Sequence, residues 1–92
     1  MAAIALPAQV TMGDARAALD QMRLAIESDP APRLDASGLA TLDTSAIAVL
    51  LECRRIAAAA DKALPIDGVP AKLTELARLY GVAELLAAPV QR

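Results

Sequence analysis

The apolar residues of this chain follow two patterns, short runs bounded by turn-forming residues and longer stretches with apolar positions three and four apart. Short apolar runs favour β-strands, and the three-to-four spacing favours amphipathic helices. The runs are residues 3–6, 33–36 and 63–67, and a helical stretch follows each of them. The pattern therefore predicts the order strand, helix, strand, helix, strand, helix.

The first helix is predicted after Thr11 and before Pro30. Thr11 and Asp14 have the spacing at which a hydroxyl and a carboxylate satisfy the N–H groups of a first helical turn. Pro30 ends the helix because proline has no N–H and clashes with the preceding turn. The expected buried stripe consists of Ala15, Ala18, Leu19, Met22, Ala25 and Ile26.

The central helix is predicted to begin at Asp43-Thr44-Ser45, three residue types that favour helix N-caps because their oxygens accept from unpaired N–H groups. Glu52 and Arg55 should lie on its solvent face as a weak ion pair. Ile47 and Leu51 lie between the two faces. The expected buried face consists of Ala46, Val49, Leu50, Cys53, Ile56, Ala57 and Ala60.

The remaining elements are a central strand, an edge strand and a last helix. Residues 33–36 suit a buried central strand and residues 37–42 a loop. Pro65 argues that the strand at 63–67 is an edge strand or a half-paired one, since proline cannot donate to a neighbour. Gly68 permits a sharp exit. The last helix should end at a left-handed Gly81 with a contact from Val82. Its inner stripe is expected to be Leu73, Leu76, Ala77 and Tyr80, with one further turn at 83–86.

Alternating strands and helices predict an α/β fold, here a mixed β-sheet with helices packed on one face. A chain of 92 residues has room for one modest core, so residues 1–92 are expected to form a single domain. The composition is 57% hydrophobic and 1% aromatic, so the core must consist of Ala, Leu, Ile and Val.

Composition also argues against several functions. A net charge of −2 without a basic cluster disfavours nucleic-acid binding. The chain has no histidine and one cysteine, Cys53, which we interpret as a core residue. The commonest metal clusters and nucleophile–base pairs are therefore missing, and its scattered glycines form no phosphate-binding loop. We expect no catalytic residues and no cofactor. Asp35 and Asp43 are interpreted as turn and cap residues.

The mean hydropathy of +0.44 raises the question of a membrane span. Asp43, Glu52 and Glu84 interrupt the apolar stretches before the roughly 18 residues that a spanning helix needs. The first arginine is Arg16, so the N-terminus is unlike a secretory leader. We expect a cytoplasmic protein.

Two segments carry a resemblance to a known family. The run Leu34-Asp35-Ala36-Ser37-Gly38-Leu39, followed by Leu42-Asp43-Thr44-Ser45-Ala46-Ile47, resembles the strand-loop-helix signature of STAS domains. The similarity continues through residues 64–69 and 72–80, and it is closest to the MlaB-like group, the small cytoplasmic subunits of bacterial phospholipid-transport ABC complexes. Three family glycines are replaced here, by Ala8, Ala46 and Asp61, the last at the end of the central helix.

The resemblance implies a non-enzymatic subunit. It would bind the ATPase of a transporter that maintains outer-membrane lipid asymmetry, and would associate with the inner face of the inner membrane through that partner. In the MlaB-like group a functionally important threonine falls on Thr44. In anti-sigma-factor antagonists the phosphorylated serine falls on Ser45, so the alternative is an antagonist that binds an anti-sigma kinase and is switched at Ser45.

The sequence thus predicts a partner-binding or regulatory site at Asp43, Thr44, Ser45, Ile47 and Leu51, with Ser45 or Thr44 as possible phosphorylation sites. Ile47 and Leu51 fit a partner surface and a wide core stripe equally well. The same holds for the side of the last helix around Thr74 and Arg78. For the two hydroxyls, the competing interpretation is a simple helix N-cap.

Overall fold

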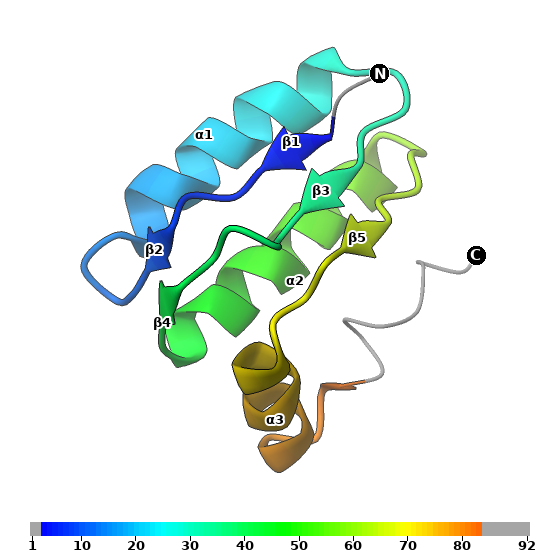
Figure 1. The fold of residues 1–92 in the computed structure, drawn as a ribbon. Helices are drawn as coiled ribbons and strands as arrows, with labels where there is room; N and C mark the ends of the chain where they lie inside the picture. The colour runs from blue at the N-terminus through cyan, green and yellow to red at the C-terminus, as the bar shows by residue number, and fades with distance from the viewer. Residues whose placement is uncertain (1–2, 84–92) are drawn as a thin grey trace.

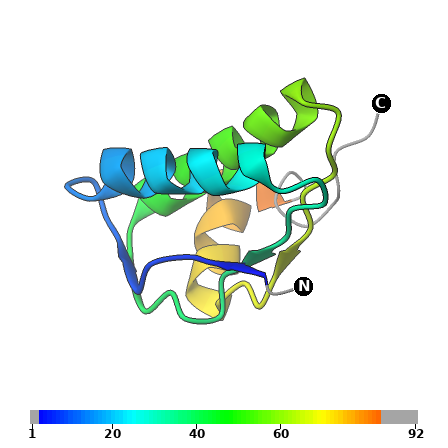
Figure 2. The same cartoon turned by 90° about the horizontal axis from the view of Figure 1, so that it is seen from above.

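The structure is a computed structural model that describes residues 3–83, and it confirms the α/β class. Helices α1 and α2 run side by side and cover one face of a layer of short strands, as two perpendicular views show (Figures 1 and 2). Helix α3 lies beyond the end of β5, next to the start of α2 (Figure 1). The described elements are, in order, β1 (Ile4–Ala5), β2 (Gln9–Val10), α1 (Ala15–Ser28), β3 (Leu34–Asp35), β4 (Thr41–Leu42), α2 (Thr44–Ala59), β5 (Ile66–Asp67) and α3 (Ala71–Leu79).

Strands β1, β3 and β5 form a parallel sheet with β3 in the middle. The central placement of residues 33–36 is confirmed, because Leu34 and Ala36 are both fully buried on the helix side. The edge placement of β5 is also confirmed. Proline is tolerated at position 65 because this residue pairs with β3 through its carbonyl oxygen, which accepts a hydrogen bond from the Leu34 N–H at 2.9 Å. This pairing does not need the N–H that proline lacks.

The sequence predicts a loop over residues 37–42, and this prediction is wrong for the last two residues. Residues 41–42 form β4, which pairs in parallel with β2, a strand that the sequence pattern missed. Two-residue strands are too short to show any alternation of polar and apolar positions. The pairings described among residues 3–83 are all parallel, where the sequence analysis expected a mixed sheet.

The three described helices bury most of the predicted stripes. On α1, Ala18, Met22 and Ile26 are buried, while the other three predicted residues are half-buried. On α2 the predicted face is buried except for Ala60, which is exposed because the helix has already ended there. On α3, Tyr80 is 61% exposed, which corrects its assignment to the inner stripe.

Both α2 and α3 end in a left-handed residue, and this geometry explains one departure from the family pattern. At the end of α2, Asp61 takes a φ of 59°, and the N–H groups of Asp61 and Lys62 donate to the carbonyls of Ala58 and Ala57 at 3.0 and 2.8 Å. Aspartate is among the residues that tolerate this conformation best after glycine. Asp61 therefore ends α2 in the left-handed conformation that glycine most often supplies at a helix end.

The end of α3 has the predicted form. Gly81 has a φ of 75°, and the Val82 N–H donates to the Ala77 carbonyl at 2.8 Å. Val82 packs against the core, as expected for the hydrophobic contact of such a cap.

Gly68 connects β5 to α3 at a point where no side chain fits. Its φ is 70°, and a Cβ there would lie 2.8 Å from the Cβ of Ser37. We expect Gly68→Ala to lower the free energy of unfolding by about 2 kcal/mol, because strain and a steric clash add. Urea unfolding measures this. Gly38→Ala is the matched control, since a Cβ at Gly38 would meet no atom within 4 Å, and equal effects of the two substitutions would contradict the expectation.

Candidate functional site

The start of α2 is capped by Asp43. This residue has extended backbone angles, and its Oδ1 accepts a hydrogen bond from the Ser45 N–H at 2.8 Å, so the predicted N-cap is confirmed. The bond from the Ser45 amide is the main reason why the pKa of the Asp43 carboxyl lies below its ordinary value. Asp43 is therefore charged at neutral pH, where a carboxylate favours the positive end of the helix dipole.

Asp43 also ties the start of α2 to the loop before α1. Because β2 and β4 pair in parallel, the segments that leave them lie side by side, and the Met12 N–H donates to Asp43 Oδ2 at 3.1 Å. In the same loop, Asp14 Oδ2 accepts from both the N–H and the hydroxyl of Thr11, at 3.1 and 2.7 Å. These bonds lower the pKa of Asp14, with the Thr11 hydroxyl as the largest cause. The predicted capping of the first turn of α1 by Thr11 and Asp14 is wrong, because α1 begins at Ala15 without a side-chain cap and the bonds between Thr11 and Asp14 close a turn that precedes the helix.

Two substitutions separate the hydrogen-bonding role of Asp43 from the effect of its charge. Asp43→Ala should lower the melting temperature by roughly 5 °C at pH 7, because two N–H groups lose their acceptor. Asp43→Asn should retain most of that stability, since asparagine also caps helices. Thermal melts followed by circular dichroism measure both.

The lowered pKa of Asp43 sets the pH dependence. The stability that this carboxylate contributes is present above its unfolded value, near 3.8, and is lost as the pH falls through the lower folded value. Asp43→Asn should therefore lose less stability than the unmodified protein as the pH falls below about 4. If the stability of the two proteins fell equally with pH, this assignment would be contradicted.

The two predicted hydroxyl residues differ in accessibility. Thr44 is exposed in the first turn of α2, whereas Ser45 is half-buried. The Ser45 side chain is a smaller cause of the lowered pKa of the Asp43 carboxyl, after the bond from the Ser45 N–H. Thr44 is consequently the hydroxyl that a partner can reach more freely.

Thr44 lies at the edge of an open, mostly apolar hollow between α2 and the end of α3. The hollow has a volume of about 310 Å³. Three of the five predicted site residues, Thr44, Ile47 and Leu51, line it from α2. The other lining residues are Ala48, Tyr80 and Val82. The tertiary structure thus brings the end of α3 to the predicted site, and we call these six residues the α2–α3 hollow.

The residues that expose apolar surface in the α2–α3 hollow are not all the ones that the sequence predicted. Ile47 is 6% exposed and belongs to the core, so it offers little surface, while Leu51 is half-buried. Tyr80, which sequence reasoning placed inside, is 61% exposed and is the most exposed of the large apolar residues that line the hollow. The available signal was that this sole aromatic residue directly precedes a helix-ending glycine, where the helical face no longer points to the core.

Thr74 and Arg78 do not line the α2–α3 hollow. The Thr74 hydroxyl donates to the Pro70 carbonyl within its own helix at 3.3 Å, and Arg78 is exposed.

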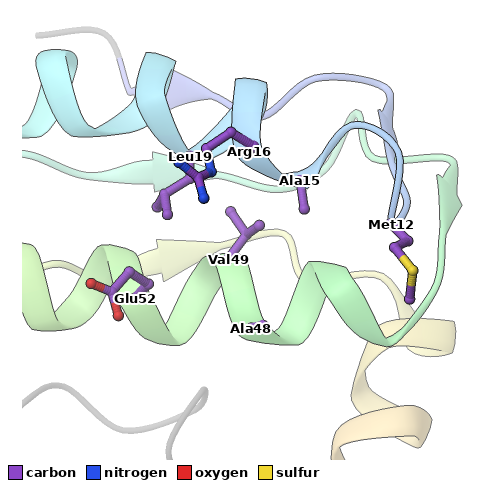
Figure 3. Close-up of a pocket in the computed structure, with 7 residues that line it drawn as sticks. All are labelled: Met12, Ala15, Arg16, Leu19, Ala48, Val49 and Glu52. Carbon is purple, nitrogen blue, oxygen red and sulfur yellow. The ribbon is translucent and has the colours of Figure 1, made fainter.

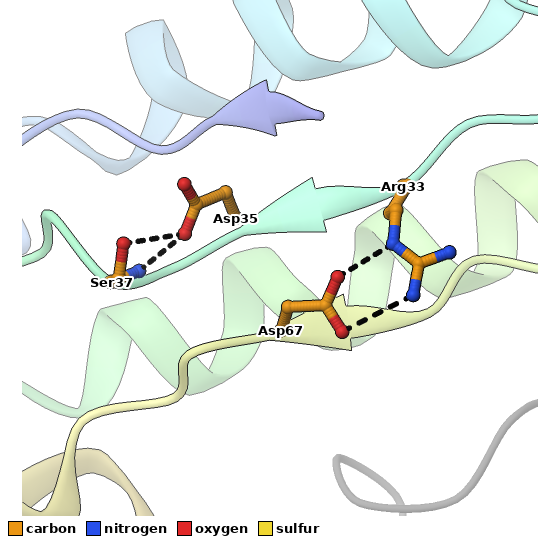
Figure 4. A network of polar contacts seen from close by, with 4 residues as sticks. All are labelled: Arg33, Asp35, Ser37 and Asp67. Atoms are coloured by element: carbon orange, nitrogen blue, oxygen red, sulfur yellow. Dashed lines mark hydrogen bonds and ion pairs between the residues drawn. The ribbon is translucent and has the colours of Figure 1, made fainter. Parts of the chain in front are cut away.

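The other predicted acidic residue, Asp35, lies in the sheet and not at the start of α2. Its Oδ1 accepts from the N–H and the hydroxyl of Ser37, at 2.9 and 2.6 Å, and the hydroxyl is the main cause of its lowered pKa. Nearby, Arg33 pairs with Asp67 at 2.6 Å across β3 and β5 (Figure 4). Both partners of this pair are about half exposed, so it adds little stability. The interpretation of Asp35 as a turn residue is confirmed.

The predicted ion pair and the core cysteine are both confirmed on α2. Arg55 Nη1 lies 3.0 Å from Glu52 Oε1. Burial raises the pKa of the Cys53 thiol to about 12, with a smaller contribution from Glu52. Such a thiol stays protonated and unreactive.

Arg54, which the pattern did not single out, is 5% exposed, and its burial lowers its pKa.

Residues 3–83 contain no group of three histidine, cysteine, aspartate or glutamate side chains that could hold a metal ion. In the same part of the chain, no helix combines the length and the apolar character needed to span a bilayer.

Comparison with known proteins identifies the family. The family model described as "Mlab, STAS domain" matches residues 2–87. Comparisons with curated proteins and with solved structures gave no match. The chain therefore belongs to the MlaB-type family of STAS domains, a class of generally non-enzymatic binding domains.

Proposed function

We propose that this STAS domain is a non-enzymatic subunit that binds the ATPase of a phospholipid-transport ABC complex and supports its assembly or activity. The observation that carries the proposal is the α2–α3 hollow, where an exposed Thr44 hydroxyl adjoins the apolar surface of Leu51 and Tyr80. Aromatic and aliphatic residues beside a few polar groups are typical of the centre of a protein interface. Membership of the MlaB-type family supports an ATPase as the partner.

Thr44 and Asp43 would have different roles in this contact. Asp43 holds the start of α2 and the Met12 loop in place, while Thr44 presents its hydroxyl to the partner. Leu51 and Tyr80 would contribute apolar area. Each of these roles is one of binding and orientation, and none requires a bond to be made or broken.

The alternative function is that of an anti-sigma-factor antagonist, switched by phosphorylation at Ser45. The geometry supports it less, because Ser45 is half-buried and its N–H is bonded to the Asp43 carboxylate. A phosphate there would lie beside a carboxylate that is charged at neutral pH. Incubation with a cognate kinase, followed by mass spectrometry of the intact protein, separates the two functions. Stoichiometric phosphate on Ser45 would favour the antagonist.

The test of the main proposal is co-expression with the ATPase subunit of an Mla-type transporter from the same organism. We expect a stable complex in size-exclusion chromatography and a higher rate of ATP hydrolysis by the complete transporter with this subunit than without it. Migration of the two proteins as separate species, at concentrations above about 10 μM, would refute the proposal.

A further inference from the structure

We propose that residues 84–88 of this chain cover the α2–α3 hollow in the free protein, so that a partner must displace them to reach Thr44 and Leu51. The inference deepens the proposed function by adding a regulation at the same site, and the part that concerns the partner rests on that function. The covering segment lies outside the described residues, as does most of the helical turn that the sequence predicts at 83–86.

The described part of the chain ends at the edge of the hollow. Gly81, with a φ of 75°, closes α3, and the Val82 N–H donates back to the Ala77 carbonyl at 2.8 Å. This turn brings Val82 into the lining of the hollow, and Val82 and Ala83 both pack against the core. The chain therefore leaves the described residues in contact with the domain and next to the hollow.

The sequence that follows has apolar residues at the spacing of one helical face. Ala83, the last described residue, already has helical backbone. Leu85 and Leu86 lie three and four positions after Val82, and side chains at these spacings share one face of a helix. Pro89 ends such a helix, because proline disfavours helical backbone in the residue before it. One short helical turn would therefore place both leucines on the side where Val82 meets the hollow.

The lining of the hollow suits an uncharged apolar segment. None of the six described residues that line it carries a charge. Tyr80 is 61% exposed and Ala48 is exposed, so residues 3–83 leave apolar surface uncovered there. Residues 85–88 read Leu-Leu-Ala-Ala and are likewise uncharged. Burial of the two leucines against this lining would remove apolar area from water, which stabilises the contact.

The groove between α1 and α2 suits this segment less well. It has a volume of about 450 Å³, and Arg16 from α1 and Glu52 from α2 both line it (Figure 3). An apolar segment seated there would lie against two charged side chains, which cost free energy to remove from water. Val82, next to the end of the described chain, lines the α2–α3 hollow and not this groove. The hollow is therefore both the nearer and the chemically better match.

Coverage of the hollow by the chain itself would weaken partner binding. When only a fraction of the molecules has an open site, the measured dissociation constant equals the intrinsic constant divided by that fraction. An open fraction of roughly one tenth to one third weakens binding roughly three- to tenfold. Residues 84–88 would thus set the affinity of the proposed ATPase contact without being part of it.

The first test is nuclear magnetic resonance of isotope-labelled protein, residues 1–92, without a partner. Tyr80 is the only aromatic residue, so its ring protons are assigned without ambiguity. We expect nuclear Overhauser effects from the methyl groups of Leu85 or Leu86 to the Tyr80 ring or the Leu51 methyl groups. A mixture of labelled and unlabelled protein distinguishes contacts within one molecule from contacts between two. Absence of these effects, or their appearance only between molecules, overturns the inference.

The second test is calorimetric titration of the ATPase with variants of the whole chain. The double substitution Leu85→Ser and Leu86→Ser should tighten binding roughly three- to tenfold, because it opens the hollow. Val90→Ser is the matched control, since Val90 is an apolar residue that lies beyond Pro89, and it should leave the affinity within about twofold. Circular dichroism checks that both variants stay folded.

The outcomes separate this inference from the proposed function. If the ATPase binds but the double serine variant binds with equal or lower affinity, the regulation is wrong and the proposed function stands. If no complex with the ATPase forms, the proposed function fails and the regulation fails with it. The Overhauser effects alone then decide whether residues 84–88 cover the hollow.

Discussion

Replacement of Thr44 by arginine is expected to weaken binding to the ATPase roughly 10- to 100-fold while the domain stays folded. Thr44 is exposed and makes its contribution at the edge of the α2–α3 hollow, so a long cation there would displace a partner from Leu51 and Tyr80. The effect on folding should be small, because a positive charge near a helix N-terminus costs only about 0.3–1 kcal/mol. Affinity is measured by isothermal titration calorimetry, and folding by circular dichroism.

Two further variants make the Thr44 result specific. Thr44→Glu should also weaken binding, although a negative charge at this helix end is neutral or favourable for folding. Thr41→Arg is the matched control, since Thr41 is an exposed threonine on β4 that does not line the α2–α3 hollow. Undiminished binding by both Thr44 variants would remove Thr44 from the interface.

Leu50→Ala is expected to be the most destabilising substitution considered, lowering the free energy of unfolding by about 3 kcal/mol. Leu50 is 1% exposed on α2, in the core cluster between the helices and the strands. Its truncation removes apolar contacts and leaves a cavity that a close-packed core cannot fully close. For a domain of this size, whose total stability is roughly 5–14 kcal/mol, the loss is a large fraction.

Leu24→Ala provides the control for this effect. Leu24 is 71% exposed on α1, so the same truncation should change the free energy of unfolding by no more than about 0.5 kcal/mol. Urea denaturation of both variants measures the difference. If Leu50→Ala were as mild as Leu24→Ala, α2 would not be packed as the structure describes.

Sequence reasoning succeeded where a residue acts through its immediate neighbours. Asp43 caps α2 because its carboxylate reaches an N–H two residues away, and Gly81 ends α3 through bonds within six residues. The Glu52–Arg55 pair spans one helical turn. Such interactions are set by local backbone geometry and so can be predicted from spacing alone.

The errors have a common cause. Strands β2 and β4 are two residues long, so their pairing depends on where residues 8–10 and 40–42 meet in space. Tyr80 follows the helical period of the core residues, but the helix ends there and the ring is left exposed. Periodicity describes positions within one element only. It therefore predicts neither the pairing of two short strands nor the burial of a residue at the end of a helix.

The sequence by itself determined the α/β class, the cap at Asp43, the helix end at Gly81 and most of the buried stripes, because each follows from bonds or periodicity within one segment. The tertiary structure alone decided that Tyr80 and Val82 meet Thr44 and Leu51 in one hollow, and that Met12 lies beside Asp43. These contacts join residues about 30 positions apart. Their formation depends on the parallel pairing of β2 with β4 and on the packing of α3 against α2, which no local pattern encodes.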